Sequence, residues 1–160
     1  MKKRCWLRGL LVVVLLSSAS LECQELTVEY DSTRHVLSRA EIEALPHVRV
    51  TASEHASLVY FEGASLKTVL EKSGFRFGES MKGKRLASCL LVEGLDGYRV
   101  VIALPELDPG FTDKQIVLAF LRDEKPLEGK EGPYRIVIAN EKRMARWVRQ
   151  VTALKIVEVQ

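Results

Sequence analysis

The chain consists mainly of short strand-like segments, and this feature limits its fold more than any other. Apolar residues either alternate with polar ones or form unbroken runs of a few residues, and both patterns are typical of β-strands. Helical patterns are confined to two short stretches, and strands and helices do not alternate regularly. The sequence therefore predicts an α+β domain rather than a βαβ fold. The expected strands are residues 26–30, 47–53, 58–62, 86–93, 98–104, 116–121, 134–138 and 154–159.

Each of the two expected helices begins at a serine that can cap its first turn. Ser38-Arg39-Ala40-Glu41 is a capping box, which predicts a short helix that ends before Pro46. Ser65 precedes an apolar i, i+3, i+4 stripe, and Gly74 closes that second helix. We expect Gly63 to end the strand that leads into it.

Two segments after the second expected helix have sequence patterns that indicate a particular kind of strand or turn. Asp96-Gly97 separates two apolar runs, and this dipeptide predicts a tight hairpin because both residues tolerate positive φ. Residues 116–121 are wholly apolar, which indicates a strand covered on both faces.

The first 20 residues have the features of a secretory signal peptide. Four cations near the start precede an apolar run at residues 10–16 and small residues at 17–20. The run is far shorter than the ~20 residues that span a bilayer, so we expect no stable membrane anchor. The prediction is an exported protein, periplasmic or secreted, with residues 1–20 as leader and residues 21–160 as a single domain.

The positive charge of the chain belongs to this leader. Lys and Arg number 24 against 21 Asp and Glu, and removal of four leader cations leaves 20 against 21, a net charge of −1. General nucleic-acid binding needs a basic excess on the folded domain, so the sequence predicts no nucleic-acid partner.

Cysteine and histidine give little support for a metal or thiol site. Cys5 leaves with the leader, and an exported compartment permits a disulfide between Cys23 and Cys89, although the sequence does not show that they meet. Cys89 lies in an apolar segment, which we interpret as a small core hydrophobe; a thiol-based enzyme is the alternative. His47 and His55 would lie ~26 Å apart on a straight strand, so we expect them to face solvent.

Standard catalytic motifs are missing, and the basic residues of the C-terminal third carry more information. G-x-S-x-G, P-loop, G-x-G-x-x-G, H-E-x-x-H and C-x-x-C do not occur. Arg135 stands in an otherwise apolar strand, where an unpaired guanidinium would be costly. Lys142, Arg143, Arg146, Trp147 and Arg149 follow closely. Two interpretations stay open here: a solvated basic loop with a tryptophan anchor, or an anion site.

Four motifs in order resemble the molybdopterin-binding domain of the sulfite oxidase family. Gly-Pro-x-Arg-Ile-Val-Ile at 132–138, followed by Ala-Arg-Trp-Val at 145–148, is similar to the end of that domain. The segment 60–66 resembles its aromatic-x-Gly-hydrophobic-x-Leu passage into a helix. Asp-Gly-Tyr at 96–98 and Asp-Glu-Lys-Pro-Leu at 123–127 resemble its hairpin and its Gly-x-Pro-Leu turn. The resemblance covers roughly residues 58–154.

This resemblance implies a mixed β-sheet, barrel-like domain with a few short helices, a molybdenum-carrying pterin and oxo-transfer chemistry. It implies cofactor contacts at the motif positions Arg135 and Arg146, and charge adds Lys142 and Arg143. Trp147, Asp96 and Tyr98 are expected to border the pocket. The expected partners are a small anionic ligand or the pterin, and an envelope redox protein.

Two positions depart from the family pattern. The family's metal is held by a cysteine thiolate upstream of the aromatic-x-Gly segment, and residues 48–55 contain no cysteine, so no metal ligand is predicted. Glu131 stands where the family often has histidine. The alternative to a molybdopterin-binding oxidoreductase is therefore a metal-free domain that serves as a periplasmic binding or protein-interaction module.

Overall fold

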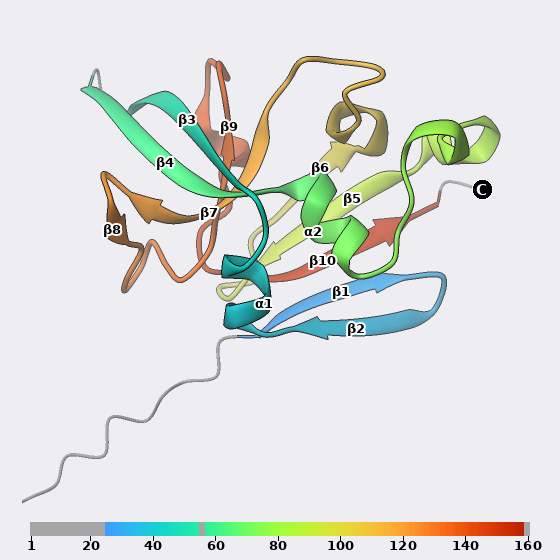
Figure 1. Cartoon of the computed structure of the whole chain (residues 1–160), viewed down its shortest axis with the longest axis horizontal. Coiled ribbons are helices and arrows are strands. Elements are labelled where there is room, and N and C mark those ends of the chain that lie inside the picture. The colour runs from blue at the N-terminus through green and yellow to red at the C-terminus, as the bar shows by residue number, and fades with distance from the viewer. Residues whose placement is uncertain (1–24, 55–56, 159–160) are drawn as a thin grey trace, which may run out of the picture.

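The strands form two separate five-stranded sheets (Figure 1). The computed structural model describes residues 25–54 and 57–158. The first sheet has the strand order β2-β1-β10-β5-β6, and the second has the order β3-β4-β7-β8, with β9 also paired to β7. The first comprises β2 (Thr33–Leu37), β1 (Leu26–Tyr30), β10 (Val151–Val157), β5 (Cys89–Gly94) and β6 (Arg99–Ala103); the second comprises β3 (His47–Glu54), β4 (Ser57–Ser65), β7 (Ile116–Arg122), β8 (Lys125–Pro126) and β9 (Arg135–Ile138).

The α+β class and the mixed sheet are confirmed, but the barrel-like shape is wrong. Within the described ranges the first sheet ends at β2 and β6, and the second sheet begins at β3, which pairs only with β4. A barrel requires its outermost strands to pair with each other. The outermost strands of these sheets do not, so each sheet keeps free edges.

The first and last strands lie side by side in the middle of the first sheet. β1 pairs in parallel with β10, with Val28 opposite Leu154, whereas the other pairs of this sheet are antiparallel. β10 also pairs with β5. It therefore connects the N-terminal hairpin β1–β2 to the hairpin β5–β6, and the sheet depends on the last part of the chain.

Both predicted helices are present with the caps that the sequence indicates. α1 (Arg39–Glu43) has the full capping box: the Ser38 hydroxyl accepts a hydrogen bond from the Glu41 amide, and the Glu41 carboxylate accepts one from the Ser38 amide. In α2 (Leu66–Lys72), the Ser65 hydroxyl accepts from the Thr68 amide at 3.1 Å. Four short 3₁₀ helices complete the described helical segments: η1 (Gly78–Ser80), η2 (Gly83–Ala87), η3 (Leu104–Leu107) and η4 (Met144–Arg146).

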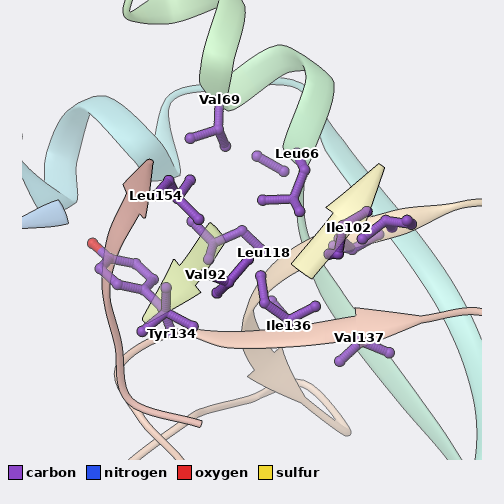
Figure 2. Packing of buried hydrophobic residues seen from close by; sticks show 14 of the residues in the cluster. Leu66, Val69, Val92, Ile102, Leu118, Tyr134, Ile136, Val137 and Leu154 are labelled. Carbon is purple, nitrogen blue, oxygen red and sulfur yellow. The ribbon is translucent and has the colours of Figure 1, made fainter. Parts of the chain in front are cut away.

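The main core lies between the two sheets and beneath α2. Figure 2 shows side chains of α2, of the first sheet and of the second sheet pointing toward one another. Leu66, Val92, Leu118, Ile136 and Leu154 all have no exposed surface. β7 is buried over its first five residues, as its wholly apolar sequence predicts.

Gly63 does not end β4; the strand continues to Ser65. A Cβ atom built on Gly63 would lie 2.1 Å from the Leu118 carbonyl oxygen, so glycine is required here by the close approach of β7. A register irregularity falls between Glu62 and Gly63 in the same ladder. The glycine therefore marks close strand packing rather than a stop.

Sequence patterns locate the hairpins better than the strand boundaries. The Asp96-Gly97 hairpin is confirmed, with Gly97 at φ 81°. Residues 86–88, expected in a strand, lie in or next to η2, and β5 starts at Cys89. β2 and β8 were not predicted. Each follows a two-residue turn in which both residues have positive φ, Asp31-Ser32 and Asp123-Glu124. Neither turn contains glycine, so the sequence lacks the usual signal of a tight hairpin there.

Candidate functional site

Four of the seven predicted site residues line one small pocket. Asp96 and Tyr98 come from the β5–β6 hairpin, Arg135 from β9, and Trp147 from the residue after η4. The pocket has a volume of about 220 Å³. We call it the arginine pocket; its remaining lining residues are Met144, Ala145 and Arg149.

Arg135 belongs to a chain of ion pairs that runs into the protein interior. Its side chain is 1% exposed, and its Nη2 donates to Oε1 of Glu54 at 2.8 Å. Its Nη1 donates to Oε2 of Glu131 at 2.5 Å. Arg122 pairs with the other oxygen of Glu54 at 2.8 Å, and Arg149 pairs with the other oxygen of Glu131 at 3.0 Å. The order is therefore Arg122–Glu54–Arg135–Glu131–Arg149.

Two aromatic rings enclose the Arg135 guanidinium. Its Cζ lies 5.3 Å from the ring centroid of Phe61 and 5.3 Å from that of Trp147, within the range of cation–π attraction. The two rings meet edge to face at 5.9 Å. Packing and ion pairing together fix this guanidinium, which explains how an arginine can occupy a strand of apolar residues.

Two buried N–H donors beside the pocket have no hydrogen-bond partner in the described structure. They are Nε of Arg135 and Nε1 of Trp147. Buried donors are nearly always paired in folded proteins, so two residues that line the pocket each keep a buried donor without a partner.

Tyr98 connects the hairpin to the η4 segment and so forms one wall of the pocket. Its hydroxyl donates to the Ala145 carbonyl at 2.7 Å, and its amide donates to Oδ1 of Asp96 at 2.9 Å. Asp96 therefore organises the hairpin turn. Both residues line the arginine pocket, and their role at a cofactor stays a prediction.

The other three predicted residues line a second, larger hollow. Lys142, Arg143 and Arg146 border an open groove of about 530 Å³, which we call the η4 groove. Ala145 borders both hollows, so the groove and the arginine pocket are neighbours. The other residues that line the groove are Lys114, Ile138, Ala139, Asn140 and Glu141.

The cations of the η4 groove differ in their partners. Arg146 donates to Glu141 and lies 3.3 Å from Glu106, and the hydrogen bond to Glu141 raises the pKa of Arg146. Lys142 and Arg143 are exposed, and no carboxylate of the described residues forms an ion pair with either. These two cations give the groove its free positive charge.

The described residues offer no site for a metal. They contain no group of three or more His, Cys, Asp or Glu side chains arranged to hold one. Cys89 starts β5 and Gly94 ends it, so the thiol lies about 17 Å along the strand from the hairpin at the pocket. Cys89 is half-buried rather than a core residue. Cys23 lies outside the described residues, so the Cys23–Cys89 disulfide stays a prediction.

His47 is exposed, as expected, and has a structural partner on each ring nitrogen. Nε2 lies 2.9 Å from the Glu43 carbonyl oxygen, and Nδ1 lies 2.9 Å from Oε1 of Glu62. His55 lies outside the described residues. The prediction of a leader also falls outside them, and none of the helices within the described ranges is long and apolar enough to cross a membrane.

Sequence reasoning did not find the carboxylates that neutralise Arg135. Glu54 is 81 residues away in the chain, and no local pattern links the two. Glu131 was noted only as a departure from the family pattern, although its place four residues before a buried arginine was a usable signal. The structure therefore explains both positions through one ion-pair chain.

Sequence comparisons do not identify a family, whereas the fold has a known counterpart. No protein-family model and no curated protein matches the chain. Among solved structures, the sulfane dehydrogenase SoxCD from Paracoccus pantotrophus is similar, with a TM-score of 0.63 and 16% sequence identity over 87% of this chain. The match covers 40% of the SoxCD chain, so this protein corresponds to less than half of that chain's length. At this identity the similarity establishes a shared fold.

Proposed function

We propose that this protein is an exported domain with a sulfite oxidase-type fold that binds a small anionic ligand of the pterin class without a tethered metal. The anionic group of the ligand lies in the η4 groove beside Lys142 and Arg143. Its uncharged ring lies in the arginine pocket, next to Trp147. The observation that carries the proposal is that two unpaired cations line the η4 groove, that two residues with unpartnered buried donors line the arginine pocket, and that Ala145 lines both hollows.

Size supports a ligand that spans both hollows. The arginine pocket, at about 220 Å³, is smaller than the ~300 Å³ at which typical ligand sites begin. The groove adds about 530 Å³ of open space. A phosphate-bearing pterin has an anionic end and a planar ring, and this division matches the separate cationic and aromatic linings.

The metal part of a molybdenum cofactor does not fit the described residues. A thiolate is the soft ligand that such a metal needs in this fold family, and Cys89 lies at the far end of β5. We therefore assign no redox step to this chain and propose a binding role rather than catalysis. The dehydrogenase activity in the name of SoxCD, to which the fold is similar, is not transferred.

Calorimetry with defined probes tests the binding role. Pterin-6-carboxylate should bind at least tenfold more tightly than inorganic phosphate, because only the pterin also occupies the arginine pocket. The double variant Lys142→Glu/Arg143→Glu should weaken binding of both probes at least tenfold, whereas the equally charged change Lys82→Glu/Lys84→Glu should leave it unchanged. Absence of saturable binding, or binding indifferent to Lys142 and Arg143, would overturn the proposal.

Metal analysis tests the second half of the proposal. Protein exported from a molybdenum-competent host should contain molybdenum at a ratio to protein near zero. A ratio near one would contradict the metal-free assignment and favour a molybdopterin oxidoreductase.

A second candidate function is a protein-interaction module of the cell envelope. It is favoured by the internal neutralisation of Arg135 and Arg146, the two motif arginines, by carboxylates of this chain. The calorimetric experiment separates the two functions, since an interaction module would bind neither probe.

A further inference from the structure

The ion-pair chain at the arginine pocket balances arginines against carboxylates. The chain Arg122–Glu54–Arg135–Glu131–Arg149 contains three arginines and two glutamates, and Asp123 pairs with Arg122 at 3.8 Å as a third carboxylate, so the formal charge of the cluster is 3 − 3 = 0. Glu54 is 4% exposed and Arg135 is 1% exposed, which places the inner pair away from solvent screening. Loss of one carboxylate therefore leaves this cluster with a charge of +1.

Glu131 lies where an external anion would contact both pocket arginines. One carboxylate oxygen accepts from Nη1 of Arg135 at 2.5 Å, and the other lies 3.0 Å from Nε of Arg149. Arg135 and Arg149 both line the arginine pocket. Two guanidiniums that share one carboxylate in this way form the arrangement that also binds sulfate or phosphate.

The position of Glu131 distinguishes it from Glu54. Glu54 is buried at the end of β3, whereas Glu131 is 29% exposed and comes from the loop before β9. It is thus a carboxylate that reaches the arginines from the solvent side. Removal of its side chain would open the site to solvent and leave Arg135 paired with Glu54.

We propose that Glu131 fills a built-in oxyanion site between Arg135 and Arg149, two residues that line the arginine pocket, and thereby excludes tetrahedral oxyanions from this site. Glu131 is a specificity-determining residue, because its carboxylate takes the position that a dianion would need between the two guanidiniums. This inference goes beyond the proposed function, because it rests on the ion-pair chain and not on the η4 groove.

Replacement of Glu131 by alanine tests the inference by anion rescue. Sodium sulfate, compared with sodium chloride at equal ionic strength, should raise the melting temperature of Glu131→Ala more than that of the wild type, because sulfate stabilises folded proteins in general and only binding to the folded state adds to that effect. Calorimetry should show that sulfate binds Glu131→Ala at least tenfold more tightly than it binds the wild type. The double variant Glu131→Ala/Arg149→Gln should bind sulfate at least tenfold more weakly than Glu131→Ala does.

The control variant is Glu141→Gln, which removes the carboxylate that pairs with Arg146 in the η4 groove. This variant should not gain a sulfate site that depends on Arg149. The inference is overturned if the wild type and Glu131→Ala bind sulfate equally tightly. It is also overturned if the higher sulfate affinity of Glu131→Ala is unchanged when Arg149→Gln is added. If Glu131→Ala and Glu131→Ser both fail to fold even in sulfate, the inference is likewise overturned, because the anion has not replaced the carboxylate.

The measurement is repeated in the Lys142→Glu/Arg143→Glu background. Sulfate binding by Glu131→Ala should persist there, since Lys142 and Arg143 do not line the arginine pocket. Loss of pterin binding in that background with retained sulfate binding therefore separates the η4 groove from the oxyanion site.

Discussion

Arg135 is the largest of the fully buried residues in the described structure by volume. A buried cation is tolerated only when it is paired and hydrogen-bonded. Here Glu54 and Glu131 supply the charge, and Phe61 and Trp147 enclose the guanidinium. The residue is therefore a structural element of the pocket before it is a ligand contact.

We expect Arg135→Ala to lower the free energy of unfolding by about 3 kcal/mol or more, because it removes the buried guanidinium that Glu54 and Glu131 share and leaves the buried Glu54 with less compensating charge. Urea denaturation followed by circular dichroism measures this loss. The control is Arg149→Ala, whose side chain is 50% exposed and should contribute about 1 kcal/mol or less. An Arg135→Ala variant as stable as this control would contradict the buried ion-pair network.

His47 makes stability depend on pH near neutrality. The Glu43 carbonyl and then the Glu62 carboxylate raise the pKa of His47. A raised pKa in the folded state means that the stabilisation is complete below the ordinary value of about 6.5 and is lost as the pH rises through the raised value. Since the imidazole side chain is 42% exposed, the effect should stay below about 1 kcal/mol.

Urea unfolding of the wild type should thus show a decline in stability between about pH 6 and pH 8. His47→Gln should remove the decline, and Glu62→Gln should reduce it while the Glu43 carbonyl still accepts from the ring. A decline of the same size in His47→Gln would assign it to another group.

At the level of elements, Gly63 determines how closely β4 approaches β7. Any side chain here would meet the backbone of Leu118 and Ala119. We expect Gly63→Ala to destabilise the protein by at least about 3 kcal/mol, since backbone atoms cannot move aside as a flexible side chain can. Thermal unfolding provides the measurement. Gly110→Ala, where the nearest atom is a side-chain oxygen of Asp108 at 3.3 Å, is the matched control and should change stability much less.

Local sequence patterns predicted the elements whose cause is local. The capping box at Ser38, the Ser65 cap and the Asp96-Gly97 hairpin depend on residues a few positions apart, and the structure has all three. Gly63 was misinterpreted because its reason, contact with β7, lies more than 50 residues away in the chain.

The candidate site was predictable in composition but not in grouping. The motif residues identify the right segments, and four of the seven residues do meet in one pocket. Their division into two hollows and the neutralisation of Arg135 by Glu54 depend on the packing of the sheets, which the spacing of residues along the sequence does not reveal. The role of these residues in ligand binding stays a prediction until the probes are tested.

At the level of the whole molecule, β10 connects two hairpins that have no other partner in their sheet. We expect deletion of residues 151–160 to abolish cooperative unfolding, because β1 and β5 would each lose the strand between them. Circular dichroism and urea titration test this expectation. Deletion of residues 158–160 keeps all of β10 and should leave the transition near that of the full chain. A cooperative transition in the longer deletion would show that β10 is dispensable.

The parallel contact between β1 and β10 also has a consequence for biosynthesis. A ribosome releases the N-terminal hairpin long before it makes the residues that must lie beside that hairpin. The first sheet therefore cannot be completed before residues 151–157 have left the ribosome, and until then the N-terminal hairpin waits for the strand that joins it to the rest of the sheet.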